Sequence, residues 1–388
     1  MIRARRAWAV AARILLLAVW IGAAATHAAW AQPLASGPTV RVLLDDALPL
    51  ARIEIVGPHH VRTPRGSHDA AHGLTWPLVA SEGAIVAGSG ERAHPVGAWI
   101  ELTPERGTIA YDGRVFRGGL RVEAIDGGLR VVNALPLEAY LRGVVPAEMS
   151  ASWPIEALKA QAVAARSYTL ASLDPTGPYD LCATDRCQVY RGVAAEHPRS
   201  DRAVAETEGI VIAVNGVPAA AYYHADSGGV VASSAEVWGR ALPYLRSRTD
   251  VSVVSPHRAW TARLDPSRLA AALASEGFTV GTPSALTVLE RSGSGRVVRA
   301  AFDGSSGRAV VAGPALTRVL RDVGLKSTRI VVTGPLAVRG DGWGHGVGMS
   351  QYGARALAEQ GYDYGRILAF YYPGVGLQQR IYRSAGVP

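Results

Sequence analysis

Cysteine is nearly absent from this chain of 388 residues, which has only Cys182 and Cys187. A zinc site needs further ligands, and two cysteines without a nearby histidine are a poor zinc set. We therefore expect no metal and no other cofactor. In an oxidising compartment, a pair with four residues between its members favours a local disulfide.

Long apolar runs are also scarce, and the one that stands out covers residues 14–25. It is preceded by four arginines, Arg3, Arg5, Arg6 and Arg13, and followed by the small-residue pattern Ala29-Trp30-Ala31. This order is typical of a secretory signal, which is too short and wrongly flanked for a membrane-spanning helix. We predict a signal peptide over residues 1–31 and an exported protein of the periplasm or cell wall. The alternative is an uncleaved segment that anchors the protein in the membrane.

The positive charge is too small to indicate a nucleic-acid-binding protein. The net charge is +8 overall, but the predicted signal holds four arginines and no acidic residue, so the mature chain carries about +4 (8 − 4). We therefore expect no nucleic-acid partner. A weakly positive protein suits the neighbourhood of an anionic envelope polymer.

The pattern of apolar residues predicts an α+β protein. Residues 39–132 alternate short apolar runs with glycine-rich turns, which predicts a β-rich region. The strands expected there are 40–44, 52–56, 84–87, 99–102, 115–116, 120–124 and 129–132. Beyond residue 132, strands at 210–214, 219–224, 230–233, 287–291 and 297–302 mix with helices over 135–172, 267–275, 313–323 and 350–359, and with a short helix that runs into residue 371.

Glu148 lies in a short segment between Pro146 and Pro154, directly before an alanine-rich helix expected to start near Ser152. We expect Pro146 to end the preceding helix. A lone carboxyl held on a rigid turn against packed helix is suited to act as a general acid. An acid in a loop is more often simply solvated, and that interpretation stays open at this point.

The segment Gly342-Trp343-Gly344-His345-Gly346-Val347-Gly348 alternates glycine with larger residues. It lacks the lysine of a phosphate-binding loop, and the serine that follows, Ser350, does not fit a nucleophile elbow. We expect the glycines to let a ligand approach the backbone, with Trp343 and His345 free to stack and hydrogen-bond. Tight packing of a glycine-rich strand against the core is the alternative.

A second polar cluster, Tyr222–Gly229, contains His224, Asp226 and Ser227. These are the residue types of a serine-hydrolase triad, but three near neighbours on one strand end cannot converge on one point. Contacts to a sugar or a peptide are the favoured interpretation. Trp238 is either a further stacking platform or part of the core.

With these clusters assembled, the chain resembles the stage II sporulation protein D family, the SpoIID/LytB group of cell-wall proteins. The resemblance spans about residues 130–375 and is carried by five segments in the family's order. They are Leu135–Met149, Ala157–Tyr168, Cys187–Gly192, Tyr223–Gly229 and Gly342–Gly353. It implies a SpoIID-like domain of mixed strands and helices over residues 133–385.

The resemblance implies that Glu148 is the catalytic acid of a Pro-x-Glu-Met segment. The residues expected to bind substrate are Arg166, Tyr168, Gln188, Tyr190, Tyr223, His224, Ser227, Trp343, His345 and Gln351. Relatives that bind zinc place a histidine beside the second cysteine, where this chain has Arg186, so the departure again favours a disulfide between Cys182 and Cys187. Glu138 and Glu156 lie at helix positions where solvated or capping roles suffice.

The family includes lytic transglycosylases, which cut peptidoglycan glycan strands without water. In that reaction the C6 hydroxyl of the muramic acid attacks C1, so one carboxyl can protonate the leaving oxygen and then accept the C6 proton, whereas a hydrolase usually needs two. The resemblance therefore predicts a transglycosylase that acts on denuded glycan strands through Glu148. The alternative is a non-catalytic protein that binds peptidoglycan and enhances an N-acetylmuramoyl-L-alanine amidase. A serine esterase acting through Ser227 or Ser350 is disfavoured, and region 39–132 is expected to be scaffold or a wall-docking module.

Overall fold

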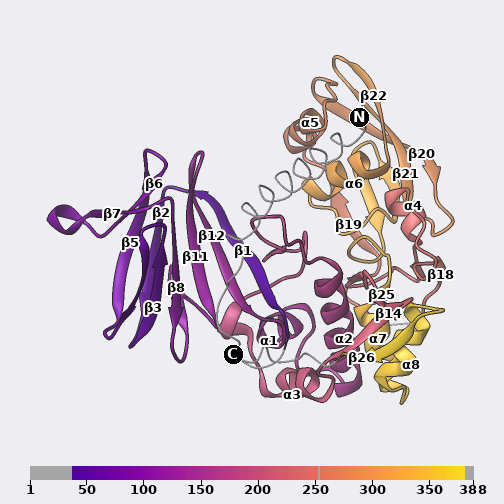
Figure 1. Cartoon of the computed structure of the whole chain (residues 1–388). Coiled ribbons are helices and arrows are strands. Elements are labelled where there is room, and N and C mark those ends of the chain that lie inside the picture. The colour runs from indigo at the N-terminus through magenta and orange to yellow at the C-terminus, as the bar shows by residue number, and fades with distance from the viewer. Residues whose placement is uncertain (1–36, 252–253, 381–388) are drawn as a thin grey trace, which may run out of the picture.

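The computed structural model describes residues 37–251 and 254–380, so the predicted signal peptide lies outside the described residues. The expected α+β class is confirmed: a β-rich N-terminal part is followed by strands that alternate with helices (Figure 1). In the described part of the chain, no helix is both long and apolar enough to cross a bilayer.

Two sheets that pack face to face build the N-terminal part (Figure 1). One has the strand order β13-β1-β12-β11-β8-β3-β4 and the other the order β10-β9-β2-β5-β6-β7. The strands are β1 (Thr39–Leu48), β2 (Leu50–Ile55), β3 (His59–Thr63), β4 (Gly66–Ala70), β5 (Leu74–Ser81), β6 (Ala84–Ala87), β7 (His94–Gly97), β8 (Trp99–Pro104), β9 (Ile109–Tyr111), β10 (Arg114–Phe116), β11 (Gly119–Ile125) and β12 (Gly128–Pro136), with a 3-10 turn at Gly90–Arg92. Buried residues alternate along β1 and β2, because only one face of each strand meets the other sheet.

Helix α2 (Ile155–Ala171) is the centre of the molecule and is buried on almost every side. Its alanines let α1 (Leu137–Glu148), α3 (Pro198–Glu206), α7 (Gln351–Glu359) and α8 (Tyr364–Tyr371) pack closely around it (Figure 1). The remaining short elements of this part are β13 (Leu181–Cys182), a 3-10 turn (Gly192–Ala195), β14 (Ile210–Val214), β15 (Val217–Pro218), β16 (Tyr223–His224), β17 (Val230–Val231), α4 (Ser234–Trp238), β18 (Arg248–Thr249), β25 (Met349–Ser350) and β26 (Gly376–Gln379).

The hydrophobic core does not divide at residue 132. One buried cluster runs from Val40 in the sheets through α1 and α2 to Tyr372. A second cluster, from Leu264 to Val338, is separate, and it forms the upper right of Figure 1. Its elements are β19 (Trp260–Arg263), α5 (Pro266–Ser275), β20 (Pro283–Arg291), β21 (Val297–Gly304), β22 (Gly307–Ala312), α6 (Gly313–Asp322), β23 (Ile330–Gly334) and β24 (Ala337–Gly340). We call these elements the second-core region.

Several boundaries differ from the expectation. Pro146 does not end its helix: α1 continues to Glu148, and the backbone N–H of Met149 closes the last turn on the carbonyl of Val145. Pro146 cannot donate to the carbonyl of Arg142, four residues earlier, and the helix ends two residues after it. The strand expected over 219–224 is reduced to β16, which pairs in parallel with β25. This pairing brings the Tyr222–Gly229 cluster next to the glycine-rich segment.

Candidate active site

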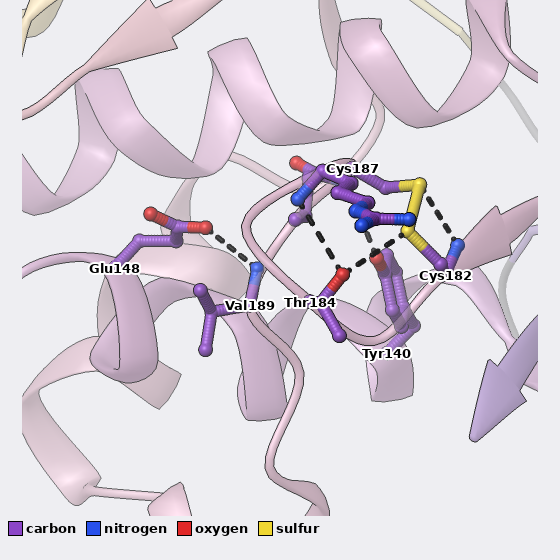
Figure 2. Close-up of a disulfide and its surroundings, with 8 residues drawn as sticks. Tyr140, Glu148, Cys182, Thr184, Cys187 and Val189 are labelled. Atoms are coloured by element: carbon purple, nitrogen blue, oxygen red, sulfur yellow. Dashed lines mark hydrogen bonds between the residues drawn. A yellow bond between two sulfur atoms is a disulfide. The ribbon is translucent and has the colours of Figure 1, made fainter. Parts of the chain in front are cut away.

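Glu148 is the last residue of α1, and both of its carboxyl oxygens accept hydrogen bonds. The backbone N–H of Val189 donates to Oε1 at 2.7 Å (Figure 2), and the side-chain amide of Gln351 donates to Oε2 at 3.3 Å. The side chain is partly buried. Three segments that are distant in sequence therefore fix this carboxyl: the end of α1, the loop after the disulfide and the start of α7.

Burial raises the pKa of Glu148 above its ordinary value of 4.5. The hydrogen bonds from Val189 and Gln351, and the nearby hydroxyl of Tyr223, act in the opposite direction, and the charge of Asp185 adds a small further increase. Burial is the largest of these effects. A carboxyl that holds its proton closer to neutral pH is what general-acid chemistry requires.

The loop that carries Val189 is held by a disulfide between Cys182 and Cys187, whose Cα atoms lie 5.5 Å apart (Figure 2). Strand β13 attaches the start of this loop to the seven-stranded sheet, and the backbone N–H of Tyr190 closes it on the carbonyl of Ala183. No group of three metal-binding side chains is found in the described ranges. The two cysteines therefore act here as a clamp on the loop that contacts Glu148.

A cleft of about 1020 Å³ opens in front of Glu148. Its walls come from the first core and from the second-core region. Among the expected substrate-binding residues, those that line it are Tyr168, Tyr223, His224, Trp343, His345 and Gln351. The fold thus brings residues from three separate stretches of sequence into one cleft: α2, the Tyr222–Gly229 cluster and the segment Gly342–Gly353.

Burial lowers the pKa of two histidines of the cleft, which favours their neutral forms. The pKa of His345 falls to about 4, with Arg296 as a second cause, and the pKa of His224 falls well below its ordinary value. The Nδ1 atom of His345 accepts a hydrogen bond from the backbone N–H of Val347. Neutral imidazoles add no positive charge that would lower the pKa of a carboxyl in the cleft.

Comparison with known proteins identifies the family. A family model described as stage II sporulation protein matches residues 125–213. The stage II sporulation protein D of Bacillus amyloliquefaciens is 30% identical over 274 residues, which cover 64% of this chain and 76% of that relative. The chain belongs to the stage II sporulation protein D family.

Two other relatives and a second family model also match this chain. A protein of Brachyspira hyodysenteriae, described as uncharacterized, is 30% identical over 87% of this chain and 92% of its own length. A Bacillus subtilis protein named amidase enhancer is 31% identical over 61% of this chain, which spans only 40% of that relative. A second family model, described as a domain of unknown function, matches residues 254–348.

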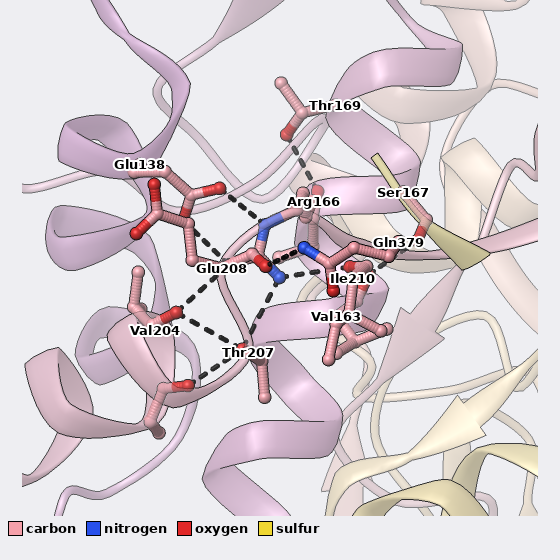
Figure 3. Close-up of polar contacts among 12 residues, drawn as sticks. Glu138, Val163, Arg166, Ser167, Thr169, Val204, Thr207, Glu208, Ile210 and Gln379 are labelled. Carbon is pink, nitrogen blue, oxygen red and sulfur yellow. Dashed lines mark hydrogen bonds and ion pairs between the residues drawn. The ribbon is translucent and has the colours of Figure 1, made fainter. Parts of the chain in front are cut away.

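Arg166 does not reach the cleft of this family member, although we expected it to bind substrate. It is fully buried, and its guanidinium forms two hydrogen bonds of 2.7 Å to the carboxylate of Glu138 (Figure 3). Further bonds go to the backbone carbonyls of Val204 and Ile210. Arg166 therefore joins α1, α2, α3 and β14, and Glu138 is a buried ion-pair partner rather than a solvated residue.

Three more of the expected substrate-binding residues lie behind the surface of the cleft. Gln188 accepts a hydrogen bond from the hydroxyl of Tyr223 at 2.9 Å, so it supports a cleft residue without lining the cleft itself. Tyr190 is buried and donates to Asn133. Ser227 is fully buried and donates to Asp250 at 2.6 Å, which occupies its hydroxyl.

Aromatic residues that the sequence left unassigned complete the cleft in two rows. The first is a row of four rings, Trp153, Tyr352, His257 and Trp343, with successive centroids 4.9, 5.3 and 4.6 Å apart. The second links Tyr168, Tyr222, Trp238 and His345, with successive centroids 5.4, 4.5 and 5.1 Å apart. Tyr168, Trp343 and His345 were expected to bind substrate and Trp238 was a candidate platform. No role in binding was expected for Trp153, Tyr352 or His257, because the contacts within each row are made between distant segments.

Proposed function

We propose that this protein is an exported lytic transglycosylase that cleaves the glycan strands of peptidoglycan, with Glu148 as its acid and base. The observation that carries the proposal is a single carboxyl with a raised pKa, fixed by two hydrogen bonds at the wall of a long, aromatic-lined cleft. Aromatic rings in such a cleft suit the apolar faces of sugar rings.

The reaction needs one proton carrier. The protonated carboxyl of Glu148 gives its proton to the glycosidic oxygen as the bond from that oxygen to C1 of the muramoyl sugar breaks. The C6 hydroxyl of the same sugar forms the new bond to C1, and its proton passes to the Glu148 carboxylate. The products are a free hydroxyl on the leaving sugar and a 1,6-anhydromuramoyl end, and the acid is restored without water.

The other two carboxyls that line the cleft are less suited to this role. Glu236 is engaged at the start of α4, where its carboxylate accepts the backbone N–H of Ser233. Asp185 is exposed on the disulfide loop. A hydrolase would require a second positioned carboxylate to activate water. The arrangement around Glu148 therefore favours the intramolecular reaction.

The test is to incubate the mature protein with denuded glycan strands and to detect anhydromuramoyl ends by mass spectrometry. Glu148→Gln keeps an acceptor for Val189 but has no proton to give, so we expect its rate to fall by about 10²- to 10⁴-fold. Glu156→Gln is the matched control, because Glu156 pairs with Lys159 and accepts the N–H of Tyr364 away from the cleft. Unchanged product formation by Glu148→Gln would refute the proposal.

A second candidate, a non-catalytic enhancer of an N-acetylmuramoyl-L-alanine amidase, is favoured by the similarity to the protein named amidase enhancer. The same experiment separates the two functions. Stimulation of an amidase by the wild type and by Glu148→Gln alike, without anhydromuramoyl ends from either, would support the enhancer. For residues 39–132, the core that they share with α1 and α2 supports a role as scaffold.

A further inference from the structure

The second-core region supplies one wall of the cleft, and the function of this wall is the subject of our inference. His257, just before β19, and Lys326, between α6 and β23, extend this wall, and both line the cleft with Trp343. All three residues lie in the stretch 254–348 that matches a domain of unknown function.

Backbone hydrogen bonds fix Trp343 between the other two residues. Gly342, before the tryptophan, donates its N–H to the carbonyl of His257 at 2.7 Å, and Gly344, after it, donates to the carbonyl of Lys326 at 2.8 Å. Gly342 has a φ of +83°, and a Cβ there would lie 2.6 Å from the carbonyl oxygen of Asp226. Glycine is therefore required for this close approach.

The indole of Trp343 is 49% exposed, which is unusual for the largest apolar side chain and marks it as a contact surface. The imidazole of His257 meets it edge to face, with ring centroids 4.6 Å apart. A flat ring that is held from one side and open to a cleft is a platform for the apolar face of a sugar.

Lys326 provides a positive charge beside this platform. Its Nζ lies 5.6 Å from the centroid of the Trp343 ring, and within the described residues it has no carboxylate partner. The chain has one other lysine, Lys159, which pairs with Glu156 and Glu206. The ammonium of Lys326 is thus held near the indole and is available to an anionic ligand.

His257 supports this platform from the side. The residue is only 9% exposed, and its Nδ1 is buried and has no hydrogen-bond partner in the part of the chain that the structure describes. This nitrogen is therefore not open to a ligand in the cleft. The contribution of His257 to the site is the edge-to-face contact of its ring with the indole.

We propose that Trp343, Lys326 and His257 form a subsite for a sugar that bears a carboxylate. The indole stacks on the sugar ring, the ammonium pairs with the carboxylate, and the imidazole of His257 holds the indole in place. The identification of the sugar as a muramoyl residue rests on the proposed function. Its carboxylate is either that of the free lactyl ether or that of an attached stem peptide.

The subsite lies two ring contacts along the first aromatic row from Tyr352. Tyr352, in the middle of that row, directly follows Gln351, the residue that contacts the catalytic carboxyl. The bound carboxylate therefore belongs to a sugar away from the bond that is cut. In this way the wall selects which strand enters the cleft, while Glu148 performs the reaction.

The experiment measures binding by isothermal titration calorimetry in a Glu148→Gln background, which keeps the glycan intact. The ligands are glycan oligosaccharides with free lactyl carboxylates, the same oligosaccharides after conversion of those groups to methylamides, and oligosaccharides that retain stem peptides. We expect about fivefold tighter binding of a carboxylated glycan than of the methylamide, as for a partly exposed ion pair.

Lys326→Met should abolish this preference and leave the affinity for the methylamide unchanged, whereas Lys326→Arg should retain it. Trp343→Ala should weaken all three ligands together. Arg299→Met is the matched control, because it removes one charge from an exposed position of the second-core region outside the cleft and should retain the preference.

The subsite is supported if either carboxylated glycan, with free lactyl groups or with stem peptides, binds more tightly than the methylamide and this difference depends on Lys326. The glycan that binds more tightly identifies the source of the carboxylate. A preference that survives Lys326→Met, or no preference in the parent protein, would overturn the inference. Because the assay measures binding and not cleavage, its result is independent of whether Glu148 is catalytic.

Discussion

At Glu148, burial and hydrogen bonding act on the same carboxyl in opposite directions. Burial disfavours the charged form, and the N–H of Val189 stabilises it, with burial the larger effect. The carboxyl is thus able to keep a proton at a higher pH than an exposed glutamate, and the backbone N–H remains in place to stabilise the carboxylate after that proton has been transferred. Both states of an acid and base are accommodated by one geometry.

This balance predicts a dependence of stability on pH. Because the pKa of Glu148 in the folded state lies above 4.5, the folded protein holds a proton over a range in which the unfolded chain has lost it. Its contribution to the free energy of unfolding is therefore full below that value and is lost as the pH rises through the raised pKa. Glu148→Gln does not titrate at this position. As the pH rises through the raised pKa, the stability of the variant relative to the wild type should therefore increase, by about 1.4 kcal/mol for each unit by which the pKa is raised.

Urea unfolding of both proteins at about pH 4 and about pH 8 measures this difference, and the value at acid pH serves as the reference. The rate of glycan cleavage should decline on the alkaline side through the same pKa, since the protonated acid is the active form. A difference in stability that is constant across the pH range would contradict the prediction.

At the same scale, Arg166 shows that residue spacing does not decide whether a side chain faces a cleft or the core. Lys159 and Arg166 are seven residues apart, and this spacing places them on one face of α2. The family resemblance placed Arg166 among the substrate-binding residues. The helix is alanine-rich all round and buried on nearly every side, so the pattern contains no signal for which face meets solvent. Arg166 instead meets Glu138, a partner on another helix that only the packing of α1 against α2 brings near.

At the scale of elements, the disulfide loop controls the carboxyl through Val189. Cys182→Ser/Cys187→Ser should lower the free energy of unfolding by about 2 kcal/mol, the chain-entropy value for so short a loop. It should also release the N–H of Val189. The hydrogen bond from this N–H lowers the pKa of Glu148, so its loss should raise that pKa. We therefore expect a slower cleavage reaction whose alkaline limb moves to higher pH.

The pH profile separates this role from simple destabilisation, which would reduce the rate without moving the limb. Reductant added to the wild type should reproduce the shift, and reductant added to the double variant should have no effect. If the variant loses stability but keeps the wild-type profile, the loop does not tune Glu148.

The elements that the sequence predicted share a clear periodic signal. Strand β14 has the predicted bounds, and helices α5, α6 and α7 lie within one residue of theirs at each end. Strands β3 and β4 were missed because they are rich in histidine, glycine and other polar residues, and helix α3 because it is short and mostly polar. These elements are held by pairing and packing with neighbours that are distant in sequence, so no local pattern marks them.

At the scale of the whole molecule, the cleft exists because two cores meet along it. The family resemblance implied one domain over residues 133–385 and did not mark residues 254–348 as a separate core. The motifs placed Glu148, Tyr223, Trp343 and Gln351 in the site because each lies in a recognisable segment. His257 and Lys326 come from the wall itself, where no motif exists, and only the docking of the second-core region against the glycine-rich segment brings them to the cleft.

Two separate cores predict two units of stability. Phe302 is fully buried in the second cluster and Phe116 is almost fully buried in the first, which gives a matched pair of substitutions. Each Phe→Ala change should cost about 3–5 kcal/mol by opening a cavity. Since the clusters do not share buried residues, Phe302→Ala should lower the hydrogen-exchange protection of β21 and α6 and leave that of α2 largely intact.

Phe116→Ala should show the reverse pattern, with protection lost in the N-terminal sheets and α2 and kept in β21. Binding should follow the same division. A loosened second core weakens the Trp343 platform, so Phe302→Ala should reduce glycan affinity. The conformation around Glu148 depends on the first core and should persist. Hydrogen exchange read by mass spectrometry tests both halves of the prediction. An equal loss of protection throughout the molecule in both variants would mean that the two cores unfold as one unit, and the wall of the cleft would then have no stability of its own.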